Sequence, residues 1–382
     1  MPAALTPSAL LPTYAPYPFS VVRGEGDRIF DDAGQAYWDF YGGHCVCATG
    51  HGHPAVVKAV ADQAATLLFY SAAASLPVRD AAAAAITGFA GMDSVFFCNS
   101  GAEANENALK FALLLTGRPK LAAFEGGWHG RTTLALSVTD DPKITGPFAA
   151  HLTPCLRLPW GDLAALAAAD FSEVAAVILE PIQSMAGIKT APKAWFQALR
   201  ATCDASGTLR IFDEIQTGMG RLGTPFAAQF YGVRPDLLTS AKGLASGVPM
   251  GAVLMTAAVA SRLKPGDLGS TFGGGPLACA ALLATVGVIR SEGLMANASA
   301  AAARLRQELA GTAVTEVLGE GLLLGLRCDR ATELKQHLLA AKILVGGSGD
   351  PTVLRLMPPL NISTGALDAL ITALHAFQPE QP

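Results

Sequence analysis

The sequence predicts an α/β fold in which helices cover both faces of a mostly parallel β-sheet. Short runs of β-branched or aliphatic residues alternate with alanine-rich segments across the middle of the chain. These runs are apolar throughout, which is typical of parallel strands buried on both faces. The chain has 382 residues and 51% of them are hydrophobic, so it can bury a large core.

The strands are predicted at 94–99, 120–124, 174–180, 209–214, 237–242 and 251–256. Helices are predicted between them, among others at 102–115 and 192–206. A long apolar helix is predicted from 276 to about 291, followed by C-terminal strands at 322–328 and 353–357. Near the N-terminus, 27–40 has the pattern of a β-hairpin with its turn at Asp32-Ala33-Gly34.

This order of elements predicts two domains. The large domain comprises 51–275, and a smaller α+β domain comprises 276–382. The N-terminal segment, 1–50, is predicted to pack with the smaller domain.

Composition excludes several classes of partner. The net charge is -4 and only 15% of residues are charged, so no basic surface is available for nucleic acid or an anionic membrane. The longest uncharged apolar segment, 273–289, begins with three glycines and a proline, which favours a buried helix over a membrane span. Seven cysteines lack paired spacing, which indicates reduced thiols and a cytoplasmic protein. No metal site is expected, because no second Cys/His pair follows Cys45 and Cys47 at a usual spacing.

Two polar side chains follow buried strands where a cofactor would bind. Lys242 ends the run LLTSAK, and Asp213 lies near the end of LRIFDE. In open α/β sheets, ligands bind outside the carboxyl ends of the strands. Pyridoxal phosphate needs an amine for its aldehyde and an anion for its ring nitrogen, so this pair predicts a pyridoxal phosphate site.

Two loops complete the predicted site. Ser100, Gly101 and Ala102 lie between a strand and the start of a helix, where backbone N–H groups can bind a phosphate. In the loop FEGGWHGRT, Trp128 can stack on a cofactor ring and Arg131 can bind a substrate carboxylate. His129 is expected to support this loop rather than to act as a base, because Lys242 is better suited to move a proton.

Each of these signals also has a plainer explanation when it is taken alone. Lys242 could be a solvated lysine in a loop, Asp213 could cap a helix, and Ser100 could be an ordinary N-cap. A G-x-G-x-x-G match at 218–223 suggests a nicotinamide enzyme, but it does not follow its strand directly and Pro225 opposes a helix start there. We therefore interpret these glycines as a loop of the active site.

Together the motifs resemble the class III, or omega, aminotransferases of pyridoxal-phosphate fold type I, above all the acetylornithine and succinylornithine aminotransferases. The resemblance covers nearly the whole chain, through RGEGDRIFDDAG, GHGHPAV, NSGAEANENALK, EPIQ, FDEIQTGMGRLG, GSTFGGGPLACAAL and LRLMPPL. It implies a mostly parallel seven-stranded sheet, pyridoxal 5′-phosphate as cofactor, and a homodimer with shared active sites.

The resemblance also implies a role for each residue. Lys242 would bind the cofactor aldehyde and Asp213 its ring nitrogen, while Ser100, Gly101 and Ala102 would bind its phosphate. The other implied cofactor contacts are Trp128, His129, Glu180, Gln216 and, from the neighbouring subunit, Thr271. Arg355 would bind the α-carboxylate of glutamate or 2-oxoglutarate, and Arg131 the distal carboxylate.

One departure from the family affects the expected substrate. Related enzymes carry a glutamate after EPIQ-G or EPIQ-S that neutralises the carboxylate-binding arginine, whereas this chain has Met185 there. We expect the pocket to stay cationic and to favour substrates that present a carboxylate to Arg355, unless another acid substitutes.

The expected activity is a ping-pong transfer of an amino group from an N-acyl-ornithine or another omega-amino donor to 2-oxoglutarate. A transaminase with another carboxylate-bearing donor, or an aminomutase, decarboxylase or racemase of the same fold, would keep Lys242 and Asp213. A non-catalytic scaffold of this fold is the remaining alternative.

Overall fold

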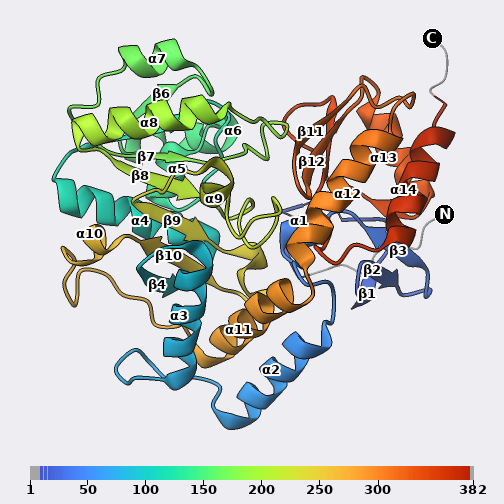
Figure 1. The fold of residues 1–382 in the computed structure, drawn as a ribbon, viewed down its shortest axis with the longest axis horizontal. Helices are drawn as coiled ribbons and strands as arrows, with labels where there is room; N and C mark the ends of the chain where they lie inside the picture. Colours follow the sequence, from blue (N-terminus) through green and yellow to red (C-terminus); the bar gives the residue numbers. More distant parts are fainter. Residues whose placement is uncertain (1–8, 12, 15, 379–382) are drawn as a thin grey trace.

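A seven-stranded sheet is the central element of the computed structural model, which describes residues 9–11, 13, 14 and 16–378 (Figure 1). In spatial order its strands are β4 (Ser94–Cys98), β10 (Gly251–Met255), β9 (Leu237–Ser240), β8 (Leu209–Asp213), β7 (Val174–Leu179), β5 (Lys120–Phe124) and β6 (Cys155–Leu158). The strands from β9 to β6 are parallel, and β10 runs antiparallel to both of its neighbours. The predicted α/β fold with a mostly parallel sheet is confirmed.

Alternate residues of each strand pack into separate cores on the two faces of the sheet. In β5, Leu121 and Ala123 contact the core that includes α4 (Gly101–Thr116), whereas Ala122 and Phe124 contact the core that includes α8 (Lys193–Ser206). This period of two is that of a strand covered on both sides. Figure 1 shows α4 and α8 on opposite sides of the strands.

One strand of this sheet was not predicted. β6 (Cys155–Leu158) pairs only with β5, so it forms an edge of the sheet. It carries Arg157, whose guanidinium donates hydrogen bonds to the backbone carbonyls of Ser137, Val138 and Thr139. An arginine in the middle of a four-residue strand breaks the apolar run on which the prediction depended.

The remaining helices cover the sheet or link it to the C-terminal part. They are α1 (Gly42–Cys45), α2 (Pro54–Thr66), α3 (Pro77–Ala90), α5 (Thr133–Val138), α6 (Pro142–Thr145), η1 (Gly146–His151), α7 (Leu163–Ala168), α9 (Ala227–Tyr231), η2 (Lys242–Ala245), α10 (Ala257–Ala260), α11 (Pro276–Ser291), α12 (Leu294–Glu308), α13 (Ala331–Ala340) and α14 (Thr364–Ala376). The bounds of α11 are those predicted.

Among the described residues, no single helix is long and apolar enough to cross a membrane. The pair α11 and α12 reaches that length and composition together, but the two helices are bent by 59° at their junction.

The two ends of the chain meet in a second sheet, with the order β1-β2-β3-β13. The predicted hairpin is present: β2 (Arg28–Asp31) and β3 (Ala36–Asp39) pair antiparallel, and β1 (Val21–Glu25) pairs with β2. β13 (Ile343–Leu344), from the C-terminal part, pairs in parallel with β3. This pairing supports the predicted packing of the N-terminal segment with the smaller domain. The domain boundaries at 50 and 275 stay a prediction.

A third sheet completes the C-terminal part. Its order is β11 (Glu316–Glu320), β12 (Leu323–Arg327) and β14 (Val353–Leu356), all antiparallel. Figure 1 shows β11, β12 and helices α12 to α14 together on one side of the molecule, with the N-terminal strands beside them.

Candidate active site

A cavity of about 550 Å³ opens at the carboxyl ends of the central strands. It is lined by most of the predicted site residues, namely Ser100, Gly101, Ala102, Trp128, His129, Arg131, Glu180, Asp213, Gln216 and Lys242, and by Met185. These residues follow β4, β5, β7, β8 and β9, all of which point to the same edge of the sheet. Thr271 and Arg355 are the predicted site residues that do not line it.

Lys242 reaches the cavity from a strained backbone. It begins η2, shortly after the end of β9, with φ at +46°, a left-handed conformation that side chains other than glycine rarely adopt. Such strain is typical of functional sites, where surrounding contacts impose it. Burial lowers the pKa of Lys242, because the protein around the amine disfavours its charge. A larger fraction of neutral amine is therefore available for covalent chemistry.

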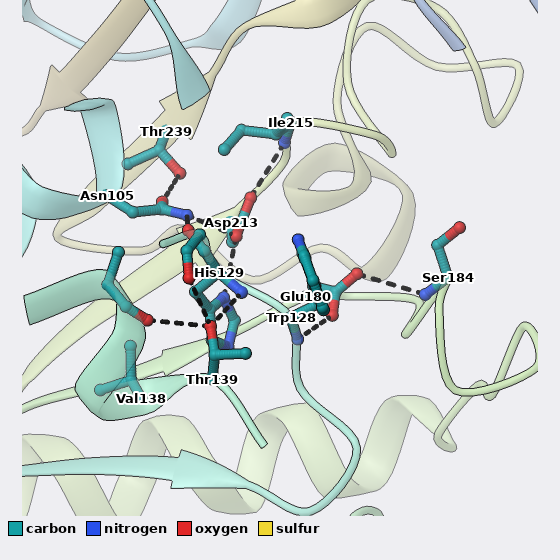
Figure 2. Close-up of polar contacts among 12 residues, drawn as sticks. Asn105, Trp128, His129, Val138, Thr139, Glu180, Ser184, Asp213, Ile215 and Thr239 are labelled. Atoms are coloured by element: carbon teal, nitrogen blue, oxygen red, sulfur yellow. Dashed lines mark hydrogen bonds and ion pairs between the residues drawn. The ribbon is translucent and has the colours of Figure 1, made fainter. Parts of the chain in front are cut away.

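The carboxylate of Asp213 is held by three donors (Figure 2). Oδ2 lies 2.8 Å from His129 Nδ1 and accepts a hydrogen bond from Asn105 Nδ2 at 2.7 Å. Oδ1 accepts a hydrogen bond from the backbone N–H of Ile215 at 3.2 Å. Asp213 is only 4% exposed, so these contacts fix its orientation at the cavity. The hydrogen bond from His129 fits the supporting role predicted for that residue.

Asn105 was missed by the sequence analysis. It is fully buried on α4, accepts a hydrogen bond from Thr239 Oγ1 at 2.7 Å, and donates both to Asp213 and to the His129 carbonyl. The available signal was an amide between Ala104 and Ala108, on the buried face of the helix. A buried polar group of this kind needs partners, and here the partners are site residues.

The neighbouring carboxyl group of Glu214 points elsewhere. It accepts hydrogen bonds from the backbone N–H groups of Ala227 and Ala228 at the start of α9 and from Thr217 Oγ1. Glu214 is fully buried, and burial raises its pKa to about 7 against the opposing effect of these hydrogen bonds. The choice of Asp213 over Glu214 for the cofactor is supported, because Glu214 is occupied as a helix cap.

Glu180 fixes the loop that carries the aromatic residue. Its carboxyl group accepts hydrogen bonds from the backbone N–H groups of Trp128 at 2.9 Å and Ser184 at 3.2 Å (Figure 2). Burial raises the pKa of Glu180 to about 7, and the charge of Asp213 adds to this effect. Trp128 is thus positioned at the cavity, with the Arg131 guanidinium carbon 5.5 Å from its ring centre.

The start of α4 has the form of a phosphate site. The helix is 16 residues long, and Gly101 and Ala102 lie in its first turn. Ser100 is also an N-cap, because its Oγ accepts a hydrogen bond from the Glu103 N–H at 3.1 Å. The hydroxyl proton of Ser100 is still available to donate, so the N-cap leaves room for the predicted phosphate contact.

Other features of the cavity fit pyridoxal phosphate. Gln216 Oε1 is buried without a hydrogen-bond partner, as expected for a side chain that binds a ring hydroxyl. Close packing also requires glycine beside the phosphate site: a Cβ on Gly101 would lie 2.7 Å from Ile215 Cδ1. A Cβ on Gly130 would lie 3.0 Å from the backbone of Ala102. In the described part of the chain, no group of three His, Cys, Asp or Glu side chains is placed to bind a metal ion.

Arg355 is a buried cation near this cavity. It is 3% exposed on β14, and its guanidinium donates to the Gly347 carbonyl at 2.6 Å and to Ser184 Oγ at 2.9 Å. Among the described residues, no carboxylate lies within ion-pair distance of it. Burial lowers its pKa, while Tyr41 and Glu180 oppose this effect electrostatically. A buried unpaired guanidinium favours binding of an anion.

Thr271 lies outside the cavity, in the exposed connection between α10 and α11. A contact between Thr271 and a cofactor would therefore need a second copy of the chain. The single chain neither tests nor contradicts this prediction.

Known proteins are similar to this chain over nearly its whole length. A family model described as aminotransferase class-III matches residues 11–377. The acetylornithine aminotransferase of Streptomyces coelicolor is 43% identical over 96% of this chain and 92% of its own length. That of Methanopyrus kandleri is 42% identical over 95% of both chains. Among solved structures, the ornithine aminotransferase of Toxoplasma gondii superposes with a TM-score of 0.91 at 31% identity, over 96% of this chain and 92% of that one.

We predict that Glu214 makes folding stability depend on pH. Its folded-state pKa of about 7 lies above the ordinary value of 4.5, so the folded protein binds the extra proton between these values. The free energy of unfolding should therefore fall as pH rises through this window, by at most about 3 kcal/mol. Glu214→Gln cannot ionise, so it should gain stability relative to the wild type between pH 5 and pH 8 in urea denaturation. An equal difference at both pH values would contradict the prediction.

Proposed function

Because the chain belongs to the class III aminotransferases and is therefore an enzyme that uses pyridoxal 5′-phosphate, we propose that it transfers the amino group of an N-acyl-ornithine, or of a similar ω-amino donor, to 2-oxoglutarate. The observation that carries this proposal is the full-length similarity to proteins named acetylornithine aminotransferase. The described cysteines are all unpaired, which supports a cytoplasmic location.

We assign a different role to each residue of the cavity. When bound, the cofactor supplies an aldehyde carbon for amines and a ring that accepts electrons from the substrate carbon. Lys242 Nζ would hold the cofactor aldehyde and, when free, would take up and return the substrate proton. Asp213, fixed by His129 and Asn105, would be the partner of the ring nitrogen. The order is ping-pong: the deaminated donor leaves before the keto acid enters.

The other side chains bind and orient. Trp128 and Gln216 line the cavity and would contact the cofactor ring and its hydroxyl, while the start of α4 would hold the phosphate. Arg355 and Arg131 bind the two carboxylates of 2-oxoglutarate. Two such cations would select substrates with two carboxylates.

Met185 favours a second candidate for the donor. It lines the cavity beside Ser184, which contacts Arg355, and it supplies no negative charge there. A donor that presents its carboxylate to Arg355 in both half-reactions would satisfy this cation. Glu180, which acts on Arg355 electrostatically, is the acid that would substitute when an ω-amine is bound.

The chain also has features that support a homodimer. Leu68, Phe69, Tyr70 and Phe272 are between 38% and 65% exposed, and the rings of Phe69 and Phe272 are 5.1 Å apart. Exposed apolar side chains that gather in this way mark interaction surfaces. Thr271 is next to Phe272, so a second chain docked on this surface would receive Thr271 at its own cavity.

The transferase proposal predicts that the wild type forms glutamate from N-acetylornithine and 2-oxoglutarate. Lys242→Ala should abolish this reaction and remove the visible absorption of covalently held cofactor, because no other described cavity residue carries a primary amine. A glutamate assay measures the loss of the reaction, and absorbance spectra measure the loss of covalently held cofactor. Unchanged turnover and colour in Lys242→Ala would refute the proposed chemistry, whereas activity with α-amino acids alone would favour the second candidate.

Met185 should set the preference between donors. The wild type should react with glutamate about 10–100-fold faster than with butylamine, because only glutamate brings a carboxylate to Arg355. Met185→Glu should narrow this ratio by neutralising Arg355, and the uncharged Met185→Gln should not. Single-turnover rates of the amino-donor half-reaction measure the ratio. Equal rates with glutamate and butylamine in the wild type would contradict the proposed preference for donors with a carboxylate.

Phe272→Asp should separate the dimer. A charge in the apolar surface would have to be desolvated on docking, so the mass measured by light scattering should fall from twice the chain mass to 39.3 kDa. Phe148→Asp is the matched control, since Phe148 is 53% exposed on η1, which follows α6. Unchanged mass of Phe272→Asp would contradict this interface.

A further inference from the structure

A cysteine, a histidine and an aspartate form a connected group at the end of β3 and in the segment that follows it, outside the active-site cavity. Asp39 ends β3, and the chain then passes through a left-handed turn at 42–45, where φ lies between 57° and 70°. A hydrogen bond from the Gly50 N–H to the Cys47 carbonyl, at 3.2 Å, closes a second turn. These two turns bring Cys47 and His51 together beside Asp39.

The ring of His51 is held from two sides. Its Nε2 lies 2.8 Å from Asp39 Oδ2. Its backbone exchanges hydrogen bonds with Gly26 at 2.9 Å and 2.7 Å, and a Cβ on Gly24 would lie 2.7 Å from His51 Cβ. The N-terminal strands therefore fix the imidazole in place.

Asp39 keeps this imidazole charged. Asp39 is 4% exposed, and its Oδ1 accepts hydrogen bonds from the N–H groups of Tyr41 at 3.0 Å and Gly42 at 2.8 Å. Burial opposes a charge on the His51 ring, but hydrogen bonds to Asp39 and to the Cys47 thiol outweigh this effect and raise the pKa of His51 to about 10. At neutral pH both ring nitrogens therefore donate. Since Nε2 bonds Asp39, Nδ1 is the donor that remains for Cys47 Sγ.

This contact distinguishes Cys47 from the other cysteines. Cys47 and Cys155 are partly exposed, and the others are buried. Burial raises the pKa of Cys155, so its thiol stays protonated and is a poor nucleophile. Cys47 instead contacts an imidazolium, which favours the nucleophilic thiolate. A Cβ on the exposed Gly43 would lie 3.9 Å from Cys47 Sγ, so glycine at this position leaves room for a small reagent beside the sulfur.

We propose that Cys47 is a modification site at which hydrogen peroxide oxidises the thiol to a sulfenic acid. The thiolate sulfur attacks one peroxide oxygen, and an S–O bond forms as the O–O bond breaks. Sulfur gives up two electrons to the peroxide, and the leaving hydroxide takes a proton from solvent. The product is the reversible level of cysteine oxidation. His51 positions and stabilises the thiolate, and Asp39 keeps His51 protonated. The inference goes beyond the proposed function and does not depend on the amino donor.

The test exposes the cofactor-loaded enzyme to hydrogen peroxide at pH 7 together with dimedone, which traps sulfenic acids. Peptide mass spectrometry follows the adduct at each cysteine over time. Cys47 should be labelled at least about tenfold faster than Cys155, because an ordinary thiol is only a few per cent ionised at this pH. Cys47→Ser should remove the adduct, and the matched Cys155→Ser should leave the rate at Cys47 unchanged.

His51→Gln keeps a hydrogen-bond donor for Asp39 but carries no charge, so it should slow the labelling of Cys47 about tenfold. A merely structural role of His51 would expose the thiol and speed labelling instead. His375→Gln is the control, since His375 lies on the last turn of α14 and bonds the Glu308 carbonyl. It should label Cys47 at the wild-type rate.

Labelling of Cys47 no faster than that of Cys155 in the wild type would overturn the proposal, and this comparison needs no variant. An unchanged or higher rate in His51→Gln, with a melting temperature that shows it is folded, would overturn the role assigned to His51.

Discussion

The active site depends on one buried carboxylate that is held in a single orientation. Asp213 lies at the end of β8, where water is excluded and an unsupported carboxylate would be costly. His129 from the loop after β5 and Asn105 from α4 both bind Oδ2, and Thr239 on β9 in turn holds Asn105. Hydrogen bonds thereby connect β8, β9, α4 and the loop after β5 around this carboxylate. The same network fixes the loop that carries Trp128, so the charge and the stacking surface are positioned together.

The sheet and most of its site could be predicted because both follow from simple local signals. A strand buried on both faces is apolar throughout, so a polar residue that ends such a run must lie at the edge of the sheet. Lys242, Asp213 and Ser100 were found in this way, and parallel pairing brings them to one cavity. The helix at 276–291 was bounded correctly because a proline begins it and its first charged residue is Arg290 in the last turn.

The features that escaped prediction depend on contacts between distant segments. Asn105 is one of several polar residues in α4, and only the fold shows that it faces Asp213 rather than a neighbouring turn. β6 is stabilised by its pairing with β5 and by arginine contacts to another loop, which no local pattern encodes. The left-handed turn at 42–45 contains histidine and cysteine, residues whose own preferences oppose that backbone, so tertiary contacts with Asp39 and β14 override them.

Chemistry and substrate choice are built by different parts of the chain. Lys242 and Asp213, the amine and the carboxylate of the cavity, lie at the ends of strands of the central sheet, which is packed on both faces. Arg355 and the turn at 42–45 come instead from the C-terminal and N-terminal segments, which meet beside the cavity and are joined by the β3–β13 pairing. Met185 lines the cavity without taking part in the hydrogen bonds around Asp213, so we expect a change there to leave that network intact.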